Sequence, residues 1–151
     1  MFPFRKKAIL DKDSQERVVA AIKEAESNTT GEVRVYVEHH CPHMDALDRA
    51  KELFEKLAMS KTERRNAVLV YIALTDQQFA IFGDIEIYQK AGGQQFWETA
   101  ATKLKGHLRN NEITQGLVNC VTELGKSLAL HFPYDPAVPK NELPDEIVFG
   151  K

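Results

Sequence analysis

The chain has 151 residues, of which 28% are charged and 43% hydrophobic, and its formal net charge is −2. A nearly neutral chain without a long basic run has no electrostatic basis for binding nucleic acid. Its longest apolar run is well short of the roughly 20 residues that a spanning helix needs, and it begins without a secretory signal pattern, so we expect a single cytoplasmic domain with no membrane segment.

The first third of the chain reads as a helix, a strand and a second helix. Asp13 or Ser14 can cap a helix that runs to about Glu26, because apolar residues recur there at helical spacing. Residues 32–38 alternate valines with polar or larger side chains, which predicts a strand with one strongly apolar face. Asp45 can cap a helix over residues 45–57.

The next segment predicts the central strand and a β-hairpin. Residues 67–74 are continuously apolar, as in a strand buried on both faces, and residues 79–82 resume the apolar run after a polar break. A strand, a helix and a strand in this order favour parallel pairing of the first two strands. Residues 85–91 form a short segment without a clear pattern.

The last third is mainly helical. One helix is expected around residues 96–108, and another is expected to start at Asn111 or Thr114 and end before Pro133. Residues 133–151 contain four prolines and predict an extended tail, whose apolar residues 147–149 either dock or are disordered. Together these patterns predict an α/β sandwich with a small mixed sheet. Cys41 and Cys120 are expected to be free thiols.

Four polar residues should meet at one end of this sheet. The hairpin reverses the chain, so the starts of the two parallel strands and the end of the antiparallel strand lie together. This places Glu32, Asn66, Asp84 and Glu86 at that end. Oxygen ligands of this kind suit a hard cation such as Ca²⁺ or Mg²⁺. The alternative is that the glutamates are solvated strand-end charges and Asp84 is a turn residue, and residue chemistry alone favours that alternative.

A second polar cluster follows the first strand. It contains His39, His40, Cys41 and His43, and it faces Asp76 across the sheet if the two strands are neighbours. Imidazole and thiolate groups would select Zn²⁺ or another transition metal. The spacing matches no closed zinc module, so a polar loop is the simpler interpretation. The chain has no recognisable nucleophile motif and no phosphate-binding glycine loop.

Several segments, taken together, resemble the TPM domain family. They are TGEVRVYVE from Thr30, the run from Asp45 to Leu74, TDQQFAIFGDIEIYQK from Thr75, and the later helix that contains Phe-Trp. The resemblance covers roughly residues 13–132, and the closing NELPDEIVFGK is similar to the tail of small bacterial members. It divides the chain into a domain over residues 1–132, with its core at 13–132, and a tail over 133–151.

The resemblance implies a three-layer α/β/α sandwich, a divalent cation bound in loops at one sheet edge and, for plant members, a proposed acid phosphatase activity. Gly31 and Glu32 match a Thr-Gly-x-Glu region with one residue missing, and Asn66 stands where Asn-Gly is usual. Asp76 matches the Asp of an Asp-Arg hairpin, but Gln77 replaces the arginine, which weakens a phosphate-binding role for that turn.

These observations give one leading hypothesis and two alternatives. The first is a domain that binds Ca²⁺ or Mg²⁺ through Glu32, Asp84 and Glu86, with Asn66 or Asp76 as further ligands, and that is a candidate metal-dependent phosphatase. The second is a non-catalytic module that binds a protein partner through the sheet edge or the tail. The third is a transition-metal site in the loop at residues 39–43.

Overall fold

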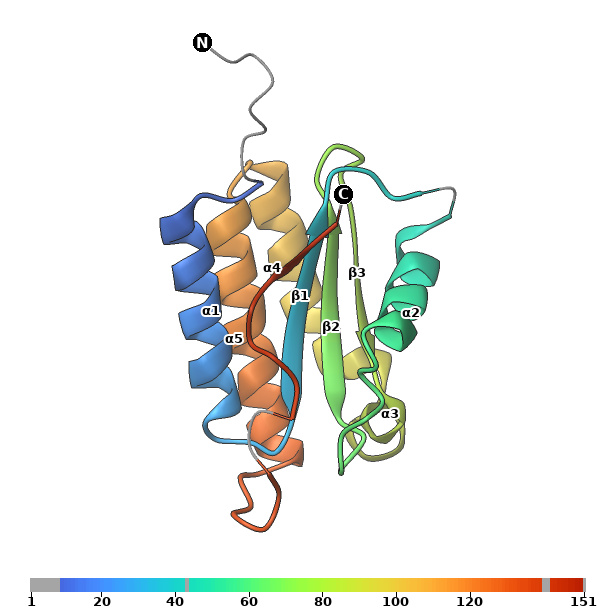
Figure 1. Cartoon of the computed structure of the whole chain (residues 1–151), viewed down its shortest axis with the longest axis vertical. Coiled ribbons are helices and arrows are strands. Elements are labelled where there is room, and N and C mark those ends of the chain that lie inside the picture. The colour runs from blue at the N-terminus through green and yellow to red at the C-terminus, as the bar shows by residue number, and fades with distance from the viewer. Residues whose placement is uncertain (1–8, 43, 140–141, 151) are drawn as a thin grey trace.

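The computed structural model describes residues 9–42, 44–139 and 142–150. Five helices and four strands are found in these ranges (Figure 1). In chain order they are α1 (Lys12–Glu26), β1 (Glu32–Glu38), α2 (Ala46–Lys56), β2 (Ala67–Ala73), β3 (Gln78–Gly83), α3 (Ile85–Ala91), α4 (Gln94–Arg109), α5 (Ile113–His131) and β4 (Val148–Phe149). Within the described residues, no helix combines the length and apolarity required to cross a bilayer.

The four strands form one mixed sheet in the order β3-β2-β1-β4. β1 and β2 are parallel, with Glu32 opposite Ala67 at the start and Glu38 opposite Ala73 at the end. β2 and β3 form the antiparallel hairpin, which sets Val68 opposite Gly83. The predicted parallel pair and hairpin are therefore confirmed.

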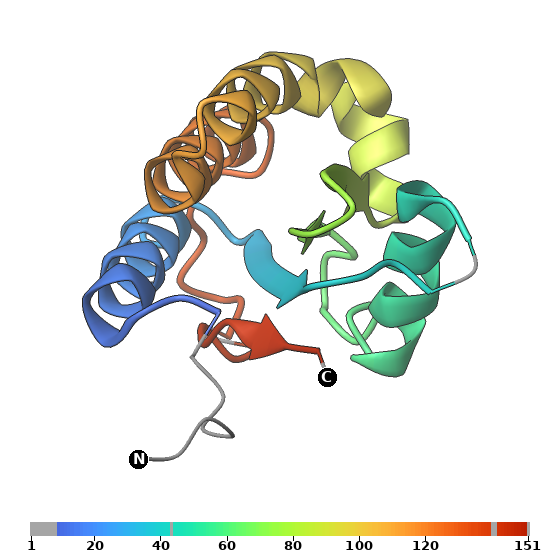
Figure 2. The same ribbon diagram turned by 90° about the horizontal axis from the view of Figure 1, so that it is seen from above.

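Helices cover both faces of the sheet, which makes the three-layer α/β/α sandwich that the resemblance implies (Figure 2). α1, α4 and α5 pack on one face, where they bury Val33, Val35 and Val37 of β1. α2 covers the other face and packs Leu53 and Phe54 against the second face of the central strands. Since both faces are covered, every residue of β1 and β2 is buried, including the polar residues of β1.

Three element boundaries differ from the sequence predictions. The N-cap of α1 is Asp11, whose side chain accepts a hydrogen bond from the Ser14 backbone N–H at 2.7 Å, so the predicted cap at Asp13 or Ser14 is wrong. α5 begins at Ile113, and its cap residue Glu112 makes no side-chain cap hydrogen bond. The unassigned segment after β3 is the helix α3, capped by Asp84.

The C-terminal segment returns along the sheet beside β1. Residues Val148 and Phe149 pair in parallel with Tyr36 and Val37 as β4, and the Gly150 N–H donates to the Val37 carbonyl at 2.9 Å. Ile147 is buried in the larger core cluster. The tail therefore docks, which was one of the two outcomes expected from its sequence. It brings residues 142–146 against the start of β1 (Figure 1).

Candidate functional site

The predicted gathering of polar residues at one end of the sheet is observed. Glu32 lies opposite Ala67 in the β1–β2 register, and Ala67 directly follows Asn66 in the chain. The Asp84 N–H donates to the Ala67 carbonyl at 2.9 Å, and the Glu86 N–H donates to the Arg65 carbonyl at 3.1 Å. Glu32, Asn66, Asp84 and Glu86 therefore share this end, which we call the start of the sheet.

Asp84 and Glu86 are held by basic side chains. Nε and Nη2 of Arg65 each donate to an Asp84 carboxylate oxygen at 2.8 Å. Asp84 also accepts the Ile85 N–H at 2.7 Å as the cap of α3. Glu86 forms an ion pair with Lys90 one turn later at 3.1 Å. These two carboxylates are already neutralised by charge and hydrogen bonds from the protein.

Glu32 lies in a different environment. Its side chain is buried, with 3% of the residue exposed, and its Oε1 accepts the Leu143 N–H at 3.0 Å. Burial raises the pKa of this carboxyl to about 7, and the nearby charges of Glu142 and Asp145 act in the same direction. No basic side chain forms an ion pair with Glu32 among the described residues.

Next to it, two further carboxyl groups, those of Glu26 and Asp145, lie close together. Glu26, at the end of α1, is buried, and its Oε2 accepts the Val33 N–H at 2.8 Å. Its side chain lies within hydrogen-bonding reach of Asp145. Glu26 Oε1 and Asp145 Oδ1 are both buried and have no donor among the described residues. Burial, with Asp145 and Glu32 nearby, raises the pKa of Glu26 to about 10.

These carboxyl groups line a cavity of about 360 Å³ between the end of α1, the start of β1 and the C-terminal segment. Its wall carries four acids, Glu26, Glu32, Asp145 and the Arg64-paired Asp135, together with Thr30 and several other residues. Lys23 is the one basic side chain among the described residues that line it. The cavity is therefore acidic, and its acids come from three separate parts of the chain.

Asn66 lies behind this cavity wall. It is fully buried, and its Nδ2 donates to the Thr30 hydroxyl oxygen at 3.0 Å. Its Oδ1 has no donor among the described residues, and neither does Oε1 of Glu142 on the C-terminal segment. Buried oxygen acceptors without a donor are rare in proteins because each one costs free energy. Here several of them gather at one end of one sheet.

The arrangement is not a closed metal site. Within the described ranges, no three His, Cys, Asp or Glu side chains are placed so that together they could hold a metal ion. Two facing carboxylates completed by hydroxyl, amide or carbonyl oxygens and water are sufficient for a hard cation. Mg²⁺ in particular is usually held through one or two carboxylates, with water in several of its remaining positions.

Asp76 lies at the opposite end of the sheet, in the β2–β3 turn. Its carboxylate accepts the Cys41 N–H at 2.6 Å and contacts His40 Nδ1 at 3.0 Å. The backbone and His40 hydrogen bonds hold the pKa of Asp76 below its usual value. One ion cannot be shared by Asp76 and Glu32. His43 is outside the described residues, and Cys41 Sγ donates to the Met44 carbonyl at 3.1 Å instead of meeting a second thiol.

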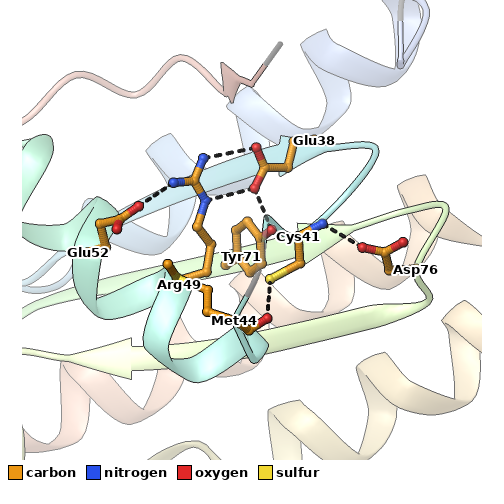
Figure 3. Close-up of polar contacts among 7 residues, drawn as sticks. All are labelled: Glu38, Cys41, Met44, Arg49, Glu52, Tyr71 and Asp76. Atoms are coloured by element: carbon orange, nitrogen blue, oxygen red, sulfur yellow. Dashed lines mark hydrogen bonds and ion pairs between the residues drawn. The ribbon is translucent and has the colours of Figure 1, made fainter.

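Beside this loop is a buried ion-pair network (Figure 3). Arg49 of α2 donates to both oxygens of Glu38, at 2.9 Å and 3.1 Å, and the Tyr71 hydroxyl donates to the same carboxylate at 2.5 Å. Arg49 also contacts Glu52. Both oxygens of Glu38 accept hydrogen bonds, and among the described residues no buried carboxylate oxygen at this end of the sheet is without a donor.

The two carboxyl groups in contact at the acidic cavity, those of Glu26 and Asp145, were missed by sequence reasoning. Sequence reasoning identified Glu26 as the approximate end of the first helix and not as a site residue, because helical spacing does not show that the last turn of a helix is covered by a distant segment. Asp145 lies in a proline-rich tail whose docking position has no periodic signal. The run of three acids at Glu142, Asp145 and Glu146 was the available hint, and it had no fixed location without the fold.

The chain matches the family model described as the TPM domain over residues 4–127. It is similar to the NMR structure of BA42 from the psychrophilic bacterium Bizionia argentinensis, with 34% identity and a TM-score of 0.88. That match covers 97% of this chain and 99% of that chain. The N-terminal domain of cg2496 from Corynebacterium glutamicum shares the fold at 12% identity and a TM-score of 0.65, over 80% of this chain and 74% of that chain.

No protein of curated function matches the chain significantly. The family match covers most of the described fold, from the residues before α1 to the last turns of α5. The match to BA42 spans nearly the whole of both chains. This protein belongs to the TPM domain family.

Proposed function

We propose that the protein binds a divalent cation, Ca²⁺ or Mg²⁺, in the acidic cavity at the start of the sheet. Glu26 and Asp145 would provide the two carboxylate ligands, and Glu32 would lie on the same cavity wall without being a third ligand. The observation that carries the proposal is the contact between the Glu26 and Asp145 carboxyl groups, in which Glu26 Oε1 and Asp145 Oδ1 are buried and receive no hydrogen bond from another described residue.

Two carboxyl groups in contact require a shared proton or a cation between them, and the charge of Arg34 acts on Asp145 as well. A proton on Glu26 can be shared between Glu26 and Asp145. It does not neutralise Glu32, a further acid on the same cavity wall. Lys23, the basic residue on that wall, is exposed to solvent and forms no ion pair with a described residue. A divalent cation neutralises two carboxylates at once, and its preference for oxygen ligands fits the hydroxyl and amide groups nearby.

The cation proposal predicts which acidic residues control affinity. Glu26→Gln and Asp145→Asn should each weaken Ca²⁺ binding by about tenfold or more, because each removes a carboxylate that the ion would bind. A tenfold loss of affinity corresponds to about 1.4 kcal/mol. Isothermal titration calorimetry with CaCl₂ and MgCl₂ at pH 8 measures this. Glu86→Gln is the matched control, since Glu86 lies at the same end of the sheet but is paired with Lys90.

The outcomes distinguish two possible sets of ligands. One set contains Glu26 and Asp145, which the structure brings together, and the other contains Asp84 and Glu86, which were expected from the sequence. If Glu86→Gln weakens binding and Glu26→Gln does not, the ion belongs with Asp84 and Glu86. If the unmodified protein shows no saturable heat at millimolar cation, the proposal is wrong for both sets.

We further propose that any catalysis at this site is hydrolysis of a phosphate monoester. The cation would polarise a phosphoryl oxygen, and Glu32 would take a proton from the attacking water as the phosphorus–oxygen bond to the alcohol breaks. A group whose pKa lies near neutrality suits that role. Mg²⁺-dependent release of p-nitrophenol from p-nitrophenyl phosphate, abolished by Glu32→Gln, is the expected result. Cation binding without any release would leave a binding domain that is not a phosphatase.

The alternative of a non-catalytic interaction module has less support from the tail. Part of the segment that would engage a partner, Val148 and Phe149, is already paired with β1 of the same chain. The tail also covers Glu32 through the Leu143 N–H. We therefore propose that the tail contributes to the cation site and does not form an interface with a partner protein.

A further inference from the structure

A second cavity, of about 410 Å³, lies at the opposite end of the sheet from the cation site. It opens where the β2–β3 hairpin meets the end of α4 and the start of α5. No residue that lines it also lines the acidic cavity. A ligand bound here would therefore be independent of the cation proposed above.

Part of the lining of this second cavity is apolar. Leu74 and Phe79 of the hairpin, Leu108 of α4 and Ile113 of α5 all line it. These four side chains are only partly buried, although they pack against the larger core. The fully buried Ile72 adds to the same wall. Apolar side chains left half-exposed around one hollow provide a surface for the hydrophobic part of a ligand.

The charged residues that line this cavity are both basic. Lys105 and Arg109 stand one helical turn apart on α4, both are exposed, and no acidic residue is among the described residues of the lining. Neither of them forms an ion pair with another described residue. Two adjacent unpaired cations at the edge of an apolar hollow attract an anion.

Amide side chains complete the polar part of the lining. Gln77, Gln78 and Asn111 lie on the hairpin and at the α4–α5 junction, and each can donate hydrogen bonds to an acidic head group. Gln77 and Asn111 have positive φ values of 55° and 57°. Asparagine adopts this conformation readily, whereas glutamine does so less often, and such backbone conformations recur at ligand-binding positions.

We propose that this cavity binds a small amphipathic anion: an alkyl or aromatic carboxylate or sulfonate with its apolar body in the hollow and its head group at Lys105 and Arg109. A wholly apolar ligand would leave both cations unused, and a strongly polar one would leave the apolar wall in contact with water. This function is additional to cation binding and requires no metal.

The test is a titration of ¹⁵N-labelled protein with sodium octanoate in metal-free buffer. The Gln77, Gln78 and Asn111 amides should shift saturably, while the Val33 and Leu143 amides at the acidic cavity should not. The variant Lys105→Glu/Arg109→Glu should bind octanoate about tenfold more weakly or worse, because two attractive charges become repulsive.

A matched control reverses two exposed cations elsewhere. Lys12→Glu/Lys56→Glu makes the same change in net charge. Lys56 lies in the last turn of α2, as Arg109 lies in the last turn of α4. This variant should retain octanoate affinity within about twofold. 1-Octanol, which lacks the charged head, should bind at least about fivefold more weakly than octanoate. Equal binding of octanol and octanoate, equal losses in both variants, or no saturable shift at the hairpin would each overturn the proposal.

Discussion

Replacing Arg49 with methionine is expected to lower the free energy of unfolding by about 3–5 kcal/mol, one of the largest losses that a single substitution would cause in this protein. Arg49 donates to both oxygens of Glu38, whose side chain is only 4% exposed. Methionine removes the charge and leaves Glu38 as a buried carboxylate with Tyr71 as its remaining side-chain donor. Urea unfolding at pH 7, followed by circular dichroism, measures the loss.

Two further variants assign this loss to the buried charge. Arg64→Met breaks an exposed ion pair with Asp135, so it should cost less than about 1 kcal/mol. The double variant Glu38→Gln/Arg49→Met removes both charges and should recover much of the lost stability. If Arg49→Met unfolds with the same midpoint as Arg64→Met, the network shown in Figure 3 does not stabilise the fold as described.

In metal-free buffer, the protein should lose stability as the pH rises from about 5 to 8. The pKa of Glu32 is raised from 4.5 to about 7 in the folded state, so the folded protein binds this proton more tightly than the unfolded chain does. The stability gained from that proton is fully present below pH 4.5 and is lost as the pH rises through 7. Its magnitude is on the order of 3 kcal/mol.

Glu26 extends the same trend to higher pH, because its pKa is raised to about 10. Glu32→Gln should flatten the decline between pH 5 and 8 and make the protein more stable than the unmodified chain at pH 8. Saturating Ca²⁺ should also oppose the decline, since it replaces the lost proton as the positive charge. Urea midpoints at four pH values test this, with the exposed Glu16→Gln as control. Parallel pH profiles for Glu32→Gln and Glu16→Gln would contradict the assignment.

The sequence was a good guide to the central part of the fold. The continuous apolar run of β2 and the alternating valines of β1 gave their strands correctly, because burial on one or two faces leaves a direct pattern in the chain. α3 was missed because seven residues are too few to show a helical period. β4 has only two residues, and it exists because the adjacent edge of β1 is free to pair with it.

The candidate site was predicted less completely than the fold. The meeting of Glu32, Asn66 and Asp84 at one end follows from strand direction alone and is observed. The strand directions do not predict which side chains contact these residues. Arg65, for example, donates to Asp84 and has a left-handed backbone conformation with φ of 50°. The contact of Glu26 with Asp145 joins residues 119 positions apart in the chain (145 minus 26), through a tail without periodic structure.

The most direct test of the central claim is a Ca²⁺ titration followed by ¹H–¹⁵N correlation spectra. The Val33 amide donates to Glu26 and the Leu143 amide donates to Glu32, so the two signals report on two of the acidic side chains that line the cavity. Both signals should shift together and saturate in the unmodified protein, and they should respond far more weakly in Asp145→Asn. If both amides stay in place at millimolar Ca²⁺ while the rest of the spectrum confirms a folded protein, no cation occupies this end of the sheet.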